Sequence, residues 1–317
     1  MKEIMKRGLQ VGLKTTYSLG KVILPITFFV TILQFTPLLP WLMNMLSPVM
    51  GLLGLPGEAT IPLVLGNMLN LYAGIGGMLT LDLTVKEAFI IAVMLSFSHN
   101  LIVESSVAAK VGIRFGVILA VRLGLAIVSA VSINLLWNGG NEKADYALAS
   151  AQKELTDPSY LEMVLLASEK AVYGVLQLAI VVIPIMVVIQ IAKEKKLLEK
   201  FSEKMKPMTG LLTVKENTSL TLIAGLVLGL AYGAGVMIAS VKEENISKRD
   251  LTLVFIFLVA CHAVVEDTFI FLPLGIPILP LFLIRIVVAF ILTLLIAKLW
   301  SSKKDIKIGG EEKNEKI

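Results

Sequence analysis

Two short polar segments interrupt a chain that is otherwise strongly apolar. The first, residues 96–106, contains one histidine, one asparagine, one glutamate and four serines. The second, residues 260–268, contains the only other histidine, His262, together with Glu266 and Asp267. Histidine titrates near neutral pH, and ionisable groups in an apolar region are costly to keep. Side chains of this kind are therefore candidates for binding a polar solute or for moving protons.

We expect one solute-binding site, built from both polar segments and from the Gly-rich segment that precedes the first of them. The alternative is structural, because each histidine and acid could instead hold its own segment against a neighbouring helix by hydrogen bonding. The predicted substrate-binding residues are Asn67, Asn70, Ser98, His99, Asn100, Glu104, Ser105, His262, Glu266 and Asp267.

Two arginines, Arg122 and Arg285, lie inside predicted spanning helices. A guanidinium group keeps a neighbouring carboxylate ionised and offers paired donors to a carboxylate or phosphate. Two interpretations stay open. Each arginine forms a structural ion pair with Glu104 or Asp267, or one of them binds an anionic solute.

Metal and enzyme chemistry have little support in the sequence. The spacing of the two histidines from the nearby acids is only a weak signal for a divalent cation, and we predict no metal site. No P-loop, zinc-binding motif or Ser/His/Asp order is present, which argues against a hydrolase or ATP-driven transport. We expect no enzymatic activity and no cofactor beyond a coupling ion, H+ or Na+.

Membrane-spanning helices must position these residues. The 317-residue chain is 56% hydrophobic and 17% charged, with a mean hydropathy of +0.84, whereas a soluble domain is about 25% charged. Apolar runs such as 172–192 reach the roughly 20 residues that span a bilayer core, and they do not alternate as barrel strands would. The sequence predicts an all-α polytopic membrane protein that binds the lipid bilayer and not nucleic acid.

The chain contains an internal duplication. Rare residue types recur at an offset of 159 positions and, after an insertion of four residues near 243–248, at an offset of 163. We predict a cytoplasmic segment 1–14, a first repeat 15–137, an external polar linker 138–166, a second repeat 167–300 and a cytoplasmic charged tail 301–317. The matching pairs include Pro25 with Pro184, Gly74 with Gly233, His99 with His262, Glu104 with Asp267, and Arg122 with Arg285.

Each repeat is expected to contain three spanning helices, an interfacial amphipathic helix and a re-entrant helical hairpin. The spanning helices are predicted at 17–37, 58–81 and 113–137, and again at 170–192, 217–240 and 277–300. The amphipathic helices are predicted at 38–54 and 193–214, and the hairpins at 86–111 and 250–276.

The arms of the first predicted hairpin hold 12 and 11 residues, so each would reach only about halfway through a bilayer. Three crossings per repeat invert the second repeat relative to the first. This topology places 21 lysines and arginines on the side of the N-terminus and 6 on the opposite side. Such a bias predicts a cell (inner) membrane protein with both termini in the cytoplasm.

The segment Leu95-Ser-Phe-Ser-His-Asn-Leu-Ile-Val-Glu104, with the Gly-rich helix before it, resembles the nucleoside-recognition or Gate domain. Concentrative nucleoside transporters, the membrane part of ferrous iron transporters and spore maturation membrane proteins share this domain. The resemblance covers roughly 15–137 and 167–300 and implies a transport-type membrane fold. It does not establish a nucleoside substrate, and it assigns no substrate residue.

We therefore expect a secondary-active transporter of a small polar solute, anionic or nucleoside-like, that works by alternating access at a midplane site. Two alternatives stay open, a non-transporting membrane component such as a spore maturation factor and a divalent-metal permease. Assembly as a homo-oligomer is also left open by the sequence.

Overall fold

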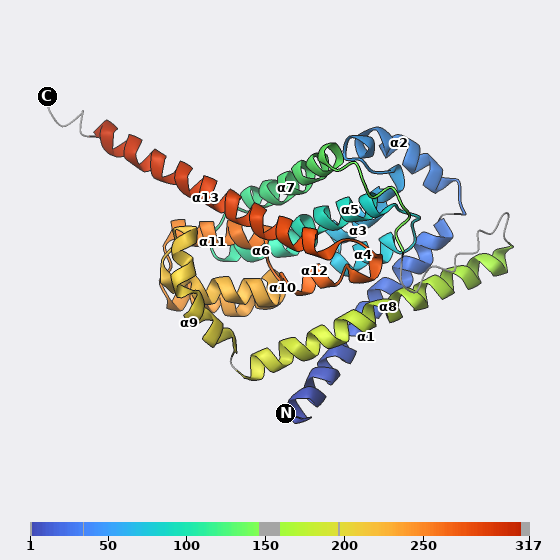
Figure 1. Ribbon diagram of the computed structural model, residues 1–317, viewed down its shortest axis with the longest axis horizontal. Coiled ribbons are helices and arrows are strands. Elements are labelled where there is room, and N and C mark those ends of the chain that lie inside the picture. Colours follow the sequence, from blue (N-terminus) through green and yellow to red (C-terminus); the bar gives the residue numbers. More distant parts are fainter. Residues whose placement is uncertain (1, 34, 146–158, 196, 312–317) are drawn as a thin grey trace.

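The computed structural model describes residues 2–33, 35–145, 159–195 and 197–311. These residues are mostly helical, with turns, short irregular segments such as 137–145 and one isolated bridge between Thr84 and Lys143 (Figure 1). The predicted all-α class is confirmed. The α-helices are α1 (Lys2–Leu33), α2 (Leu38–Leu52), α3 (Thr60–Met68), α4 (Leu71–Met78), α5 (Val85–Ser98), α6 (Leu101–Lys110), α7 (Phe115–Leu136), α8 (Tyr160–Glu194), α9 (Leu197–Thr209), α10 (Ser219–Glu243), α11 (Lys248–Ala260), α12 (Glu266–Phe269) and α13 (Ile278–Glu311), and the short 3-10 helices are η1 (Gly57–Ala59), η2 (Gly210–Leu212), η3 (Glu216–Thr218) and η4 (Leu272–Leu274).

Helices α3 and α4 form an antiparallel pair. Glycine lets their backbones touch, since a Cβ on Gly74 would lie 3.1 Å from the Cα of Gly66, and one on Gly77 would lie 3.1 Å from the Cα of Pro62. The chain reverses just before α4, where the Asn70 side chain caps the helix by accepting a hydrogen bond of 3.0 Å from the Ala73 amide. The helices have 9 and 8 residues and are therefore about 12–14 Å long.

Helix α10 contains the matching reversal. At Gly229 the backbone has φ 76° and ψ 175°, which interrupts the helix and favours glycine. After this break the chain folds back, because a Cβ on Gly233 would lie 3.0 Å from the carbonyl oxygen of Ala224. The hydroxyl of Thr221 also donates to that of Ser240 at 3.0 Å. Gly229 stands at the position of Asn70 plus the repeat offset.

Helices α5 and α6 follow each other along one path through the fold, separated by a break, and do not fold back on each other. The break is two residues long, and Asn100 adopts a left-handed conformation with φ 48°. The two helices make few contacts with each other, whereas α7 packs against both of them. Helix α7 therefore runs back along the whole of α5–α6 (Figure 1). In the second half, α13 likewise packs against both α11 and α12.

The predicted positions of the hairpins are therefore wrong. Antiparallel pairs occur in the Gly-rich segments 60–78 and 219–243, whereas 86–111 and 250–276 are broken segments that continue across the fold. The physical reason is side-chain size, because α5 carries Phe89, Ile90 and Ile91, all buried, along its length. Two helices folded tightly on each other need the small residues that the Gly-rich segments provide.

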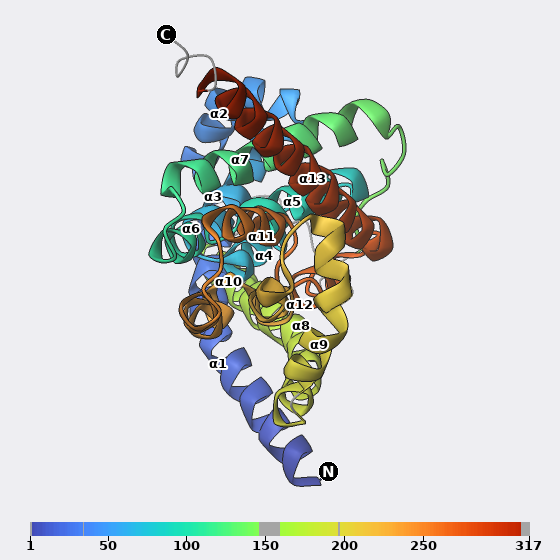
Figure 2. The ribbon, with the colours of Figure 1, turned by 90° about the vertical axis from the view of Figure 1, so that its left-hand side faces the viewer.

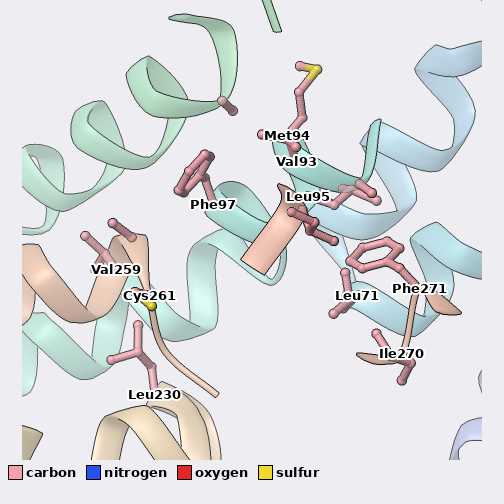
Figure 3. Close-up of a cluster of buried hydrophobic side chains, with 14 of the residues drawn as sticks. Leu71, Val93, Met94, Leu95, Phe97, Leu230, Val259, Cys261, Ile270 and Phe271 are labelled. Carbon is pink, nitrogen blue, oxygen red and sulfur yellow. The ribbon is translucent and has the colours of Figure 1, made fainter. Parts of the chain in front are cut away.

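The broken segments form the centre of the molecule. In the most apolar 18-residue stretch of Val85–Lys110, 83% of the residues are buried, compared with 22% in each of Phe115–Leu136 and Ile278–Trp300. All three segments are long and apolar enough to cross a membrane. Figure 3 shows side chains from both halves packed together, including Phe97 of α5 and Val259 of α11.

Helices α1 and α8 form a long antiparallel pair beside this centre (Figures 1 and 2). Gly8 and Gly12 of α1 face Val187 and Ile183 of α8, in the small-xxx-small pattern of closely packed helices. At one end the Arg7 guanidinium donates two hydrogen bonds, of 2.7 and 2.6 Å, to Glu194. These bonds lower the pKa of Glu194 to about 2, so the pair stays ionised at neutral pH. The pair packs against α4 of the first half and against α9, α12 and η4 of the second.

Candidate functional site

A pocket of about 290 Å³ lies where four interruptions of the helices meet. Two interruptions are the reversals at Asn70 and Gly229. The other two are the breaks that follow α5, at residues 99–100, and α11, at residues 261–265. Chain interruptions leave backbone groups without partners inside their own helix, so a polar pocket at this point is physically expected. The two halves contribute equivalent segments to its walls.

The two histidines face each other at the pocket. Their Nε2 atoms are 3.4 Å apart, and the ring centroids are 5.1 Å apart. Each Nδ1 points at a backbone carbonyl of its own helix, Leu95 at 2.7 Å for His99 and Leu258 at 2.9 Å for His262. A carbonyl oxygen only accepts, so each Nδ1 carries the proton. In the neutral rings both Nε2 atoms are therefore acceptors.

Two carboxylates approach the same pair of nitrogen atoms. Glu104 places Oε2 3.1 Å from Nε2 of His262 and Oε1 3.4 Å from Nε2 of His99. Asp267 places Oδ2 3.6 Å from Nε2 of His262 and 3.7 Å from Nε2 of His99. All four side chains are buried. Each acid thus contacts the histidine of both halves.

The two arginines bind the breaks and their acids from the side away from the pocket. Arg122 is fully buried and donates to the backbone carbonyls of Phe97 (2.8 Å) and His99 (2.5 Å), and to Oε2 of Glu104 (2.7 Å). Neither Arg122 nor Arg285 lines the pocket. Their contacts support structural ion pairing within each half rather than binding of an anion.

Arg285 has the equivalent role in the second half, with a weaker contact to its acid. It donates to the carbonyl of His262 at 2.5 Å and to the Thr268 hydroxyl at 2.9 Å, while Oδ2 of Asp267 is 3.4 Å away. The two halves are therefore chemically unequal at the centre of the site.

Backbone hydrogen bonds join each break to the Gly-rich helix of its own half, α3 or α10. The Asn100 amide donates to the carbonyl of Gly66 at 2.8 Å, and the Ala263 amide donates to the carbonyl of Gly225 at 3.0 Å. Leu95 and Leu258 cover these two glycines, in the space that a Cβ would need. The glycines thus allow each reversal to lie directly against its break.

Seven of the ten predicted substrate-binding residues line the pocket, and three do not. Ser98 donates instead to the carbonyl of Met94 at 2.8 Å, in its own helix. Asn67 Oδ1 and Ser105 Oγ are buried away from the pocket, without a hydrogen-bond partner among the described residues. The residues brought together are Asn70, His99, Asn100, Glu104, His262, Glu266 and Asp267.

Further lining residues were not among the predicted ones. Tyr72 donates a hydrogen bond to Glu266, and its position two residues after Asn70 was a usable signal. The apolar members carry no signal of their own, because nothing in their residue types separates them from ordinary core positions. They are Leu69, Leu71, Val103, Leu228, Gly229, Leu230, Ala231 and Ala263.

Comparison with known proteins matches both halves of the chain to one family. The family model described as nucleoside recognition (Gate) matches residues 16–115 and 175–277. Each matched region contains one reversal and one break. The chain is also 60% identical over 311 residues to the uncharacterized membrane protein YvoD of Bacillus subtilis (strain 168), covering 98% of this chain and 99% of that protein. No solved structure matches.

Proposed function

This chain belongs to the nucleoside recognition (Gate) family, and we propose that it is a secondary-active transporter of a small polar solute in the cell membrane. The observation that carries the proposal is the pocket at which both reversals and both breaks meet. Secondary transporters place their solute at the interface of two repeats, between interrupted helices near the midplane. Transport would proceed by alternating access around this pocket.

The proposed topology has three crossings in each half. In the first half they are α1, the broken segment α5–α6 and α7, while α3–α4 is re-entrant. A pair of helices about 12–14 Å long cannot cross a hydrocarbon core of roughly 30 Å. The 26 residues of Val85–Lys110 extend about 39 Å when helical, which is enough. Three crossings make the second half inverted relative to the first.

The basic residues support this arrangement more strongly than the one with hairpins at 86–111 and 250–276. In this arrangement the segments 60–78 and 219–243 are re-entrant, and the segments 86–111 and 250–276 cross the membrane. Lys86 then lies outside, and Lys242, Lys248 and Arg249 lie on the cytoplasmic side. The distribution of lysine and arginine then becomes 23 on the side of the N-terminus and 4 on the other. Both termini lie in the cytoplasm in this topology.

The pocket favours a compact solute with hydrogen-bond donors. Its volume of about 290 Å³ is at the lower end for small-molecule sites. Carboxylates and amide groups line it, which suits the hydroxyl and N–H groups of a nucleoside-like molecule. An anionic solute has less support, because Arg122 and Arg285 are already bound to backbone carbonyls and acids of the protein.

The experiment is a thermal-shift screen of the purified protein against nucleosides, amino acids and organic anions, followed by uptake of each hit into proteoliposomes. Imposed H+ and Na+ gradients identify the coupling ion. Asn70→Ala should abolish the shift and the uptake, whereas the exposed Asn138→Ala should leave both unchanged. If no compound shifts the unfolding temperature or moves across the membrane, a non-transporting membrane component is the better reading.

A further inference from the structure

We propose that His99, His262, Glu104 and Asp267 form a binding site for one divalent transition-metal ion of the zinc class. The inference depends only on the arrangement of these four side chains and not on the proposed transport. Among the described residues, His99, Glu104 and His262 offer ligand atoms that all lie within 4.8 Å of one another. Asp267 approaches the same two nitrogen atoms from the second half.

The distances between the ligand atoms fit one coordination sphere. The two Nε2 atoms are 3.4 Å apart, and the Glu104 oxygens lie 3.1 and 3.4 Å from them. Two ligands bound to zinc at about 2.0–2.2 Å in tetrahedral geometry are separated by roughly 3.3–3.6 Å. Asp267 Oδ2 lies 3.6 and 3.7 Å from the same nitrogens but outside the group of atoms that are all within 4.8 Å of one another, so it would have to move toward Glu104 to become the fourth ligand.

The surroundings orient these ligands as they are oriented in metal proteins. Each histidine donates its Nδ1 proton to a backbone carbonyl, which leaves Nε2 as the ligand atom. Such an outer hydrogen bond is found in nearly all histidine metal sites. Arg122 holds Oε2 of Glu104, so the carboxylate is oriented before the ion arrives.

The local charge favours a cation at this point. Two neutral imidazole nitrogens and two carboxylates are all acceptors, and their mutual repulsion needs a positive charge between them. A proton on each Nε2 would be the competing source of positive charge beside the carboxylates, and retention of metal by the purified protein distinguishes the two. The three acids that line the pocket, Glu104, Glu266 and Asp267, also outnumber the two arginines behind it, Arg122 and Arg285, by one, which favours a bound cation.

The ligand types identify the class of the metal. Imidazole nitrogens suit zinc, copper, nickel and iron, while calcium and magnesium prefer an all-oxygen shell. The single cysteine, Cys261, precedes His262 in the chain, yet it is not part of the ligand group. It therefore offers a matched control beside one of the ligands.

The test uses the full-length protein in detergent, stripped with a chelator and then loaded with Zn2+ or Co2+. We expect one metal per chain after desalting, measured by mass spectrometry of the metal. His99→Ala and His262→Ala should each weaken binding by more than about 100-fold, since loss of an outer partner alone costs about 10–100-fold. Cys261→Ala should bind the metal as the wild type does.

Two outcomes overturn the inference. The first is a wild-type protein that retains no Zn2+ or Co2+, which would leave a shared proton as the cation. The second is binding of Zn2+ or Co2+ by both histidine variants as tightly as by the wild type. If those variants do not fold, Cu2+-loaded wild type is examined by pulsed electron paramagnetic resonance, which must detect two imidazole ligands. Metal binding without solute uptake would end the transport proposal and leave the metal site standing, and uptake without metal binding would do the reverse.

Discussion

Tyr72 and Glu266 belong to different halves of the chain, and a hydrogen bond of 2.6 Å joins the tyrosine hydroxyl to Oε1 of the glutamate. Tyr72 lies near the start of α4, just after the first reversal, and Glu266 begins α12, just after the second break. Both side chains are buried and both line the pocket. The bond therefore connects the reversal of one half to the break of the other across the candidate site.

Replacing Tyr72 with phenylalanine should destabilise the contact between the halves. Tyr72→Phe removes a donor to a charged acceptor, a bond worth about 1.5–3 kcal/mol. We expect a lower unfolding temperature in detergent and a weaker thermal shift with any solute that binds the pocket. Tyr160→Phe is the control, because Tyr160 is 88% exposed. Equal unfolding temperatures for the two variants would show that the bond contributes nothing.

The proposed topology predicts opposite accessibility at the two ends of the broken segment. Single cysteines are introduced on a Cys261→Ala background and labelled in intact cells with a membrane-impermeant maleimide. Lys86→Cys should react from outside, whereas Lys110→Cys and Lys248→Cys should react only after permeabilisation. A re-entrant hairpin at 86–111 would instead put Lys86 and Lys110 on the same side. Reaction of both from one side would thus restore that hairpin.

Arg122 and Glu104 should behave as a coupled buried pair. Arg122→Met leaves the Glu104 carboxylate without its 2.7 Å partner, and an uncompensated buried charge costs about 3–5 kcal/mol. Adding Glu104→Gln to Arg122→Met should restore part of the loss, as measured by unfolding in denaturant. Arg114→Met serves as the control, because Arg114 is exposed. Additive effects of the two changes would mean that the pair is not coupled.

The position of the site could be predicted from sequence because its chemistry rests on rare residue types. His99 and His262 are the only histidines, and their constant offset within a duplicated chain indicates two equivalent places in the fold. Equivalent ionisable side chains in apolar surroundings are costly unless they meet one another or a ligand. The structure places the Nε2 atoms of these two rings 3.4 Å apart.

The local path of the chain could not be predicted from the same evidence. The Gly-rich segments and the polar segments are both apolar and of similar length, so hydropathy does not tell a reversal from a crossing. The difference arises from tertiary contacts, such as Gly74 against Gly66 in the first half. The positive φ of Gly229 is likewise a conformation that glycine permits and does not require.

The last prediction concerns the antiparallel pair α1–α8, which packs against α4, α9, α12 and η4. A Cβ on Gly8 would lie 2.9 Å from the backbone Cα of Val187, so no rotamer change can relieve a larger side chain. Gly8→Leu should therefore separate the two helices locally and cost about 1–3 kcal/mol of stability. Gly124→Leu in α7 is the matched control, since nothing lies within 4 Å of a Cβ built there. Thermal unfolding in detergent compares the two variants, and an equal loss in both would mean that close packing of α1 on α8 does not stabilise the fold.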